Sequence, residues 1–148
     1  MTAVERKVHL EKYINQIVKK ETNGFMLVGK SGIGKLNVLL SLLNKKEMPF
    51  KLCSGRITMI DVYKFLHQNN GDEVIIFSLD GGLKENEKLT HMFFHLTEER
   101  GNRSPLHMIH PDQNIPMKIS PQNPVIFVLS DHEKSFGNCF SRLPMCFY

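Results

Sequence analysis

Residues 24–36 read GFMLVGKSGIGKL, an apolar segment followed by a turn rich in glycine and then by a lysine and a leucine. Residues 25–28 are continuously apolar, which is typical of a strand buried inside a parallel sheet. The segment after the turn is apolar enough to pack as a helix on a sheet, through Leu36, Val38, Leu39, Leu40, Leu42 and Leu43. The stretch therefore predicts a strand, a tight turn and a helix, the repeating unit of an α/β fold.

The turn contains Gly29-x-x-x-x-Gly34-Lys35, which is most of the Walker A phosphate-binding motif. Its glycines allow backbone N–H groups to point inward around an anion, and the dipole of the following helix reinforces the same site. The alternative is an ordinary glycine-rich turn beside a surface lysine. We expect residues 29–36 to bind the phosphates of ATP or ADP, the candidates being Gly29, Lys30, Ser31, Gly32, Ile33, Gly34, Lys35 and Leu36.

The last position of the motif departs from its pattern. A Ser or Thr there helps to hold a magnesium ion, and this chain has Leu36 instead. The sequence therefore predicts a phosphate site and leaves the binding of Mg²⁺ open.

Further helices and strands are expected at regular intervals along the chain. They are a helix over about 3–21, strands at 50–53, 73–77, 124–129 and 145–148, helices over 58–69, 84–100 and 136–140, and a hairpin or extended loop within 101–122. This alternation predicts one domain over residues 1–148 with a three-layer α/β architecture, in which helices flank a mostly parallel five-stranded sheet. Ligands of such sheets bind at the carboxyl ends of the strands.

Composition limits the class of protein only broadly. The net charge of +4 permits contact with nucleic acid or with an acidic protein but does not require it. The three cysteines lack a paired spacing, which argues against a disulfide framework and a zinc site. No leader or membrane-spanning segment is recognisable, so we expect an intracellular, cytoplasmic protein without a membrane partner.

The order of these features resembles the core of an AAA+ ATPase, particularly the compact kind encoded by phages and mobile elements. The resemblance covers nearly the whole chain and rests on the N-terminal helix, the loop at 29–35, the strands at 74–77 and 125–129, and Ser141-Arg142 before the last strand. It implies ATP binding, a homo- or hetero-oligomeric ring, and a nucleic-acid or protein client. In the family a helical lid follows this core, and we expect this chain to lack it.

In that family the strand at 74–77 would be Walker B, followed by an Asp that orients magnesium and a Glu that polarises water. Ser78 and Leu79 stand at those positions here. Asp80 becomes a candidate metal ligand if the strand runs two residues further. The other interpretation of Asp80 is a solvated turn residue before Gly81-Gly82.

The resemblance implies two further site residues. The strand at 125–129 would be the sensor-one strand, whose tip here offers Ser130 and Asp131 near the γ-phosphate. Arg142 would be the arginine finger that reaches the nucleotide of a neighbouring subunit. With Leu36, Ser78 and Leu79 at magnesium and catalytic positions, the chain is expected to bind nucleotide with slow or absent hydrolysis. The alternative is a non-enzymatic interaction or assembly protein with a vestigial loop.

Three weaker patterns remain. His91 and His95 have the spacing of two metal ligands on a helix but lack the glutamate of a zinc protease, so a pair of helix-surface histidines is the alternative. His132 and Cys139 could form a nucleophile pair, or Cys139 could be a small buried side chain. A basic rim for DNA or RNA, or else a solvated loop, would include Arg56, Arg100, Arg103, His107 and His110.

Overall fold

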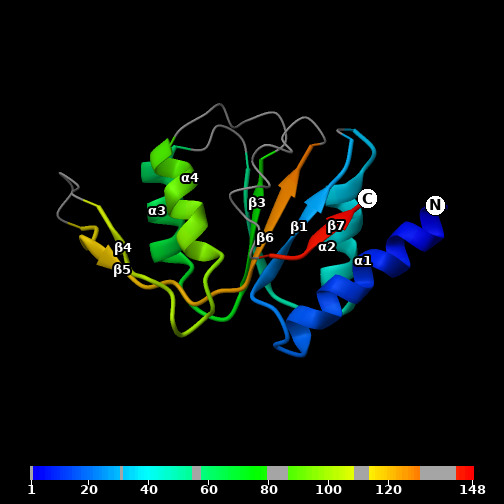
Figure 1. The fold of residues 1–148 in the computed structure, drawn as a ribbon, viewed down its shortest axis with the longest axis horizontal. Helices are drawn as coiled ribbons and strands as arrows, with labels where there is room; N and C mark the ends of the chain where they lie inside the picture. Colours follow the sequence, from blue (N-terminus) through cyan, green and yellow to red (C-terminus); the bar gives the residue numbers. More distant parts are fainter. Residues whose placement is uncertain (1, 31, 55–57, 80–86, 109–113, 131–142) are drawn as a thin grey trace.

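The computed structural model describes residues 2–30, 32–54, 58–79, 87–108, 114–130 and 143–148. This part of the chain contains four helices and seven strands, which alternate as far as α4 and are then followed by four strands (Figure 1). The helices are α1 (Ala3–Val18), α2 (Lys35–Lys45), α3 (Met59–Gln68) and α4 (Glu87–Leu96). The strands are β1 (Gly24–Val28), β2 (Phe50–Cys53), β3 (Val74–Ser78), β4 (Leu106–His107), β5 (Lys118–Ile119), β6 (Val125–Leu129) and β7 (Met145–Phe147).

Five of the strands form one parallel sheet in the order β2-β3-β6-β1-β7. Strand β1 lies between β6 and β7, with Gly24 opposite Val125 and Met26 opposite Met145. The prediction of a parallel five-stranded sheet flanked by helices is therefore confirmed. The short strands β4 and β5 pair with each other antiparallel, which confirms a hairpin within 101–122.

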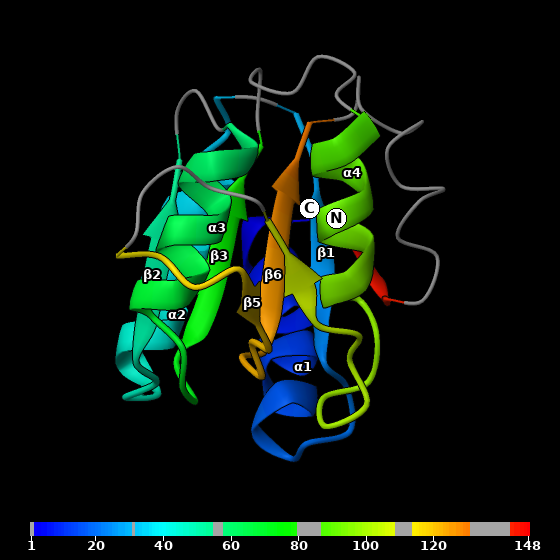
Figure 2. The same cartoon turned by 90° about the vertical axis from the view of Figure 1, so that its left-hand side faces the viewer.

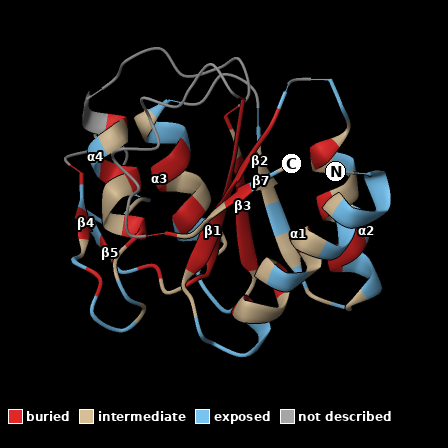
Figure 3. Ribbon diagram, turned by 45° about the vertical axis from the view of Figure 1, so that its right-hand side comes forward, coloured by how far each residue is buried: buried red, intermediate tan, exposed pale blue. Residues whose placement is uncertain are grey.

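The sheet is the middle of three layers. Helices α1 and α2 cover one face and α3 and α4 cover the other, as two perpendicular views show (Figures 1 and 2). Side chains of the strands alternate between two cores, so Phe25 and Leu27 face α1 and α2, whereas Met26 faces α3 and α4. Because both faces of the sheet are covered, the strands at its centre are buried along almost their whole length (Figure 3).

The element boundaries follow the local signals in the sequence. Thr2 caps α1 by accepting a hydrogen bond from the Glu5 N–H at 3.1 Å. Thr58 caps α3 by accepting the Asp61 N–H at 3.1 Å, and its hydroxyl donates to the Asp61 carboxylate at 2.8 Å. Helix α4 begins at Glu87 in the structure, and residues 84–86 and the expected helix over 136–140 lie outside the described residues.

The third strand of the sheet is shifted by one residue relative to the prediction. It spans Val74–Ser78 instead of 73–77, and the Leu79 N–H still donates to the Val128 carbonyl at 2.9 Å. Strand β3 therefore continues beyond the point expected from its apolar run, because its pairing with β6 extends past that run.

Candidate phosphate-binding site

The loop that follows β1 lies at the carboxyl ends of the sheet strands (Figure 1). Helix α2 begins at Lys35 with Gly34 as its N-cap, and Gly34 has φ of +81°. Gly32 has the same φ. Residues with a side chain rarely adopt this backbone conformation, so these two glycines let the chain turn from β1 into α2.

Gly29, the first residue of the loop, is needed for a different reason. Its N–H donates to the Leu129 carbonyl at 3.2 Å, and a Cβ at this position would lie 2.6 Å from the carbonyl oxygen of Tyr148. The Tyr148 N–H in turn donates to the Val28 carbonyl at 2.7 Å. The start of the loop is therefore fixed between the ends of β6 and β7, with no space for a side chain.

Lys35 brings a positive charge into this loop. The residue is only 3% exposed, and its Nζ donates to the Lys30 carbonyl at 3.3 Å. Helix α2 has no side-chain cap at its N-terminus and no acidic residue in its first turn. The positive end of the helix dipole and a buried ammonium group thus lie at the same loop, which is the arrangement that binds an anion.

Leu36, the next residue, points elsewhere. Its partly buried side chain packs against the core beneath α1 and α2, so it contributes apolar contact where the motif has a hydroxyl. Among the described residues, no group of three or more histidine, cysteine, aspartate or glutamate side chains is placed to hold a metal ion. At this position the loop therefore has an apolar side chain where the motif has a hydroxyl that helps to hold Mg²⁺.

The ends of β3 and β6 lie beside the end of β1. Ser130, which follows β6, is 4% exposed, and Leu79, which follows β3, is fully buried in the core beneath α3 and α4. Helix α2, after β1, packs on one face of the sheet, whereas α4, after β3, packs on the other. Strand β6 lies between β1 and β3, and the helices that follow those two strands cover opposite faces of the sheet. In α/β sheets, ligands bind at the carboxyl ends of the strands at such a point.

The structure therefore brings together part of the predicted site. Gly29, Lys30, Gly32, Ile33, Gly34, Lys35 and Leu36 form the loop, and Ser130 lies at the tip of the neighbouring strand. Ser31 and the predicted catalytic or metal residues Asp80, Asp131 and Arg142 lie outside the described residues, as do His132 and Cys139.

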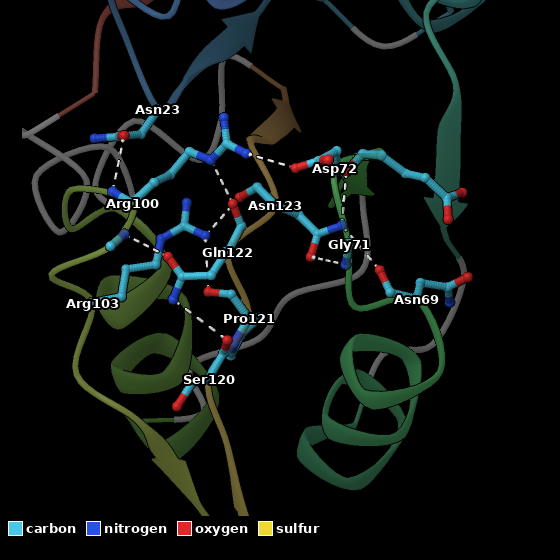
Figure 4. A network of polar contacts seen from close by, with 12 residues as sticks. Asn23, Asn69, Gly71, Asp72, Arg100, Arg103, Ser120, Pro121, Gln122 and Asn123 are labelled. Carbon is cyan, nitrogen blue, oxygen red and sulfur yellow. Dashed lines mark hydrogen bonds and ion pairs between the residues drawn. The ribbon is translucent and has the colours of Figure 1, made fainter.

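A second polar cluster, which sequence analysis missed, lies at the opposite end of the sheet (Figure 4). Asn123 is fully buried immediately before β6. Its Nδ2 donates to the carbonyls of Asn69 at 2.9 Å and Glu73 at 2.8 Å, and its Oδ1 accepts the Gly71 N–H at 3.4 Å. Asn123 therefore joins the end of α3 and the start of β3 to the start of β6.

Arg103 completes this cluster from the segment after α4. Its Nε donates to the Glu98 carbonyl at 3.2 Å, and its Nη1 donates to the carbonyls of Pro121 at 3.2 Å and Asn123 at 2.6 Å. Its Nη2 finds no hydrogen-bond partner within the described ranges. Burial and the nearby Arg100 lower the pKa of the guanidinium to about 10, while Glu98 opposes the shift.

Arg103 is thus a structural residue, and both sequence-based interpretations of it were wrong. It is only 6% exposed, so it belongs neither to a basic rim nor to a solvated loop. Its neighbour Arg100 lies 3.5 Å from the exposed Asp72 carboxylate and donates through Nε to the Gln122 carbonyl. Arg56 and His110 lie outside the described residues. Of the remaining members of that rim, His107 is exposed and Arg100 is partly exposed.

The described residues include no helix with the length and apolar character needed to cross a membrane. Comparison with protein-family models found no match for this chain, and comparison with curated proteins found none. The likeness to a P-loop NTPase therefore rests on the motif at 29–36, the parallel α/β sheet and the place of the loop in that sheet.

Proposed function

We propose that this chain binds a nucleoside polyphosphate, ATP or ADP, through the loop at residues 29–36, as an AAA+-like P-loop module with impaired hydrolysis. One observation carries the proposal. The ammonium group of Lys35 is buried inside a glycine loop at the uncapped, positive end of α2. A buried cation at a helix N-terminus is stabilised when an anion binds beside it.

The residues of the loop would act by positioning phosphate. The hydrogen bond from Lys35 to the neutral Lys30 carbonyl is long, at 3.3 Å, and a charged phosphate oxygen is a stronger acceptor. Lys35 would exchange one partner for the other when a ligand binds. The backbone N–H groups at the start of α2 would contact the same phosphate.

Impaired hydrolysis follows from the side chains at the positions that the resemblance assigns to catalysis. Leu36 packs on the core, Leu79 is buried, and Ser78 continues β3. None of these three can orient a metal ion or activate water as a carboxylate does. Strand β3 runs to Ser78, one residue beyond the expected 77, and the Leu79 N–H still bonds to the Val128 carbonyl of β6. This longer pairing supports Asp80, the residue after Leu79, as the candidate metal ligand.

By the same resemblance, we propose that the module works in the cytoplasm within a homo- or hetero-oligomeric ring. Arg142 would serve the nucleotide of the neighbouring subunit, and Asp131 would lie near the γ-phosphate. The client would be a nucleic acid or a protein, and the origin a phage or mobile element.

The test is equilibrium binding of ATP and ADP to the wild-type chain and to Lys35→Ala, each with Mg²⁺ and with EDTA. Lys45→Ala is the matched control, since Lys45 is an exposed lysine at the other end of α2. We expect Lys35→Ala to weaken ATP binding at least tenfold, because a charge-assisted contact to phosphate is lost. Lys45→Ala should bind as the wild type does.

The effect of Mg²⁺ on ATP binding distinguishes a site that holds phosphate alone from one that also holds a metal ion. Binding that is equal with Mg²⁺ and with EDTA would support a phosphate cradle without an organised metal. Strong dependence on Mg²⁺ would support Asp80 as a ligand and call for a hydrolysis assay. If ATP does not bind, or binds equally to Lys35→Ala, the proposal is wrong and the vestigial-loop alternative takes its place.

A further inference from the structure

Two histidines lie together on α4, away from the phosphate loop. His91 and His95 are one helical turn apart, which places both imidazoles on the same side of the helix. Their ring centroids are 4.8 Å apart and the rings are nearly perpendicular, at 86°. His91 is exposed and His95 is partly buried, so the pair is open to solvent from one side.

A carboxylate supports the second of these rings. The Nδ1 atom of His95 lies 3.0 Å from Oε1 of Glu98, and Oε2 of Glu98 accepts a hydrogen bond from the Ser104 hydroxyl at 3.3 Å. A carboxylate on Nδ1 favours the tautomer that carries the proton there. The lone pair of Nε2 is then available, which is the arrangement seen behind histidines that bind metals.

The position on the helix also favours a cation. His95 lies in the last turn of α4 and His91 in the turn before it. The partial negative charge at a helix C-terminus stabilises a positive ion nearby. Glu98 adds a carboxylate at the same end.

From this geometry we propose that His91 and His95 form a binding site for a divalent transition-metal ion. Each histidine supplies one imidazole nitrogen, Glu98 orients His95, and water completes the coordination. Imidazole ligands suit Zn²⁺, Cu²⁺ and Ni²⁺, whereas Mg²⁺ and Ca²⁺ prefer oxygen. The site is separate from the phosphate loop and does not depend on its function.

The experiment is titration of the intact chain with NiCl₂ under reducing conditions, followed by calorimetry and by thermal unfolding. Ni²⁺ is the better probe because thiolates compete more strongly for Zn²⁺, and the chain has three cysteines. We expect Ni²⁺ to bind one site and raise the melting temperature, and MgCl₂ at the same concentration to do neither.

Variants locate the ion. His91→Ala and His95→Ala should each weaken Ni²⁺ binding by at least about tenfold, because each leaves a single imidazole. His67→Ala is the matched control, since His67 is an exposed histidine in the last turn of α3. It should bind Ni²⁺ as the wild type does. Equal binding by the wild type and His91→Ala would overturn the proposal.

Glu98→Gln tests the role of the carboxylate without removing a ligand. We expect about tenfold weaker binding of Ni²⁺, with circular dichroism unchanged. Imidazole ¹⁵N shifts provide an independent measurement, because metal binding should move Nε2 of His95 and leave Nδ1 protonated. Metal-induced shifts confined to other histidines would also overturn the proposal.

Discussion

Neighbouring residues of α2 have opposite environments. Lys35 directs its ammonium to the loop carbonyl of Lys30, whereas Leu36 packs into the core beneath α1 and α2. A helix turns by about 100° per residue, so adjacent side chains point in different directions. At the scale of single residues, the positive charge inside the loop and the apolar side chain at the last motif position are therefore set independently.

Cys146 provides a test of burial at this scale. It lies in β7, fully buried against the core beneath α1 and α2, and burial raises the pKa of its thiol from 9.0 to about 12. The unfolded chain loses this proton at a lower pH than the folded chain does. The free energy of unfolding should therefore fall as pH rises from about 9 towards 12, with a limiting slope of roughly 1.4 kcal/mol per pH unit.

Urea unfolding between pH 7 and 10.5 measures this slope, and Cys146→Ala is the control. Cys53, Tyr13 and Tyr63 also have pKa values raised mainly by burial, and they add the same sign of dependence. Cys146 supplies a smaller part of the shift at Tyr13, so its removal lowers that contribution as well. The variant should thus show a shallower slope than the wild type. Identical slopes would mean that the Cys146 thiol is not the source.

At the scale of elements, polar contacts from distant segments join the end of α4 to the rest of the fold. Arg103 donates to the carbonyl of Glu98, just beyond α4, and to two carbonyls in the segment before β6. Asn123 joins that segment to α3 and β3. Two side chains thus connect the loops at the amino ends of two sheet strands (Figure 4).

Arg103→Ala should lower the free energy of unfolding by roughly 3 kcal/mol, because it leaves three carbonyls without this buried charged donor. Arg100→Ala is the matched control, since Arg100 is more exposed and its ion pair with Asp72 is at the surface. It should cost less, about 1 kcal/mol. Urea unfolding of both variants measures the difference, and equal losses would contradict a specific role for Arg103.

The sequence predicted most elements because their signals are local. Thr58 with Asp61 marked the start of α3, and the apolar run at 125–129 marked β6. The roles of Asn123 and Arg103 depend on carbonyls that are distant in sequence, such as Asn69 and Pro121. No local pattern specifies such partners, so a loop rich in polar residues was the natural prediction.

In the candidate site, too, features with local sequence signals were predicted, and features that depend on distant residues were not. The glycine spacing indicated the turn and its lysine, because a positive φ and an anion site both have local signatures. The close approach of Tyr148 to Gly29 arises only when β7 pairs with β1. The extension of β3 to Ser78, with the Leu79 N–H bonded to the Val128 carbonyl, likewise depends on pairing with β6, which an apolar run alone does not reveal.

At the scale of the whole molecule, the sheet has a protected centre and a more open edge. Strands β1 and β6 are buried at every residue, whereas β2 contains an exposed lysine, Lys51, and is only partly buried elsewhere. Amides in β1 and β6 should therefore exchange with solvent only when the molecule unfolds globally.

Hydrogen exchange followed by NMR tests this expectation. The amides of Met26, Leu27, Ile126 and Phe127 should be the slowest, and those of β2 should exchange at least tenfold faster. Equal protection of β2 and β1 would show that the sheet opens as a single unit.

The place of β1 between β6 and β7 also determines when the phosphate loop can form. Gly24 pairs with Val125 and Met26 with Met145, so both partners of this early strand belong to the last part of the sequence. Pairings so distant in sequence require large loops to close first, which slows folding. During synthesis the glycine loop leaves the ribosome long before β6 and β7, so it takes its folded shape only as a late product of folding.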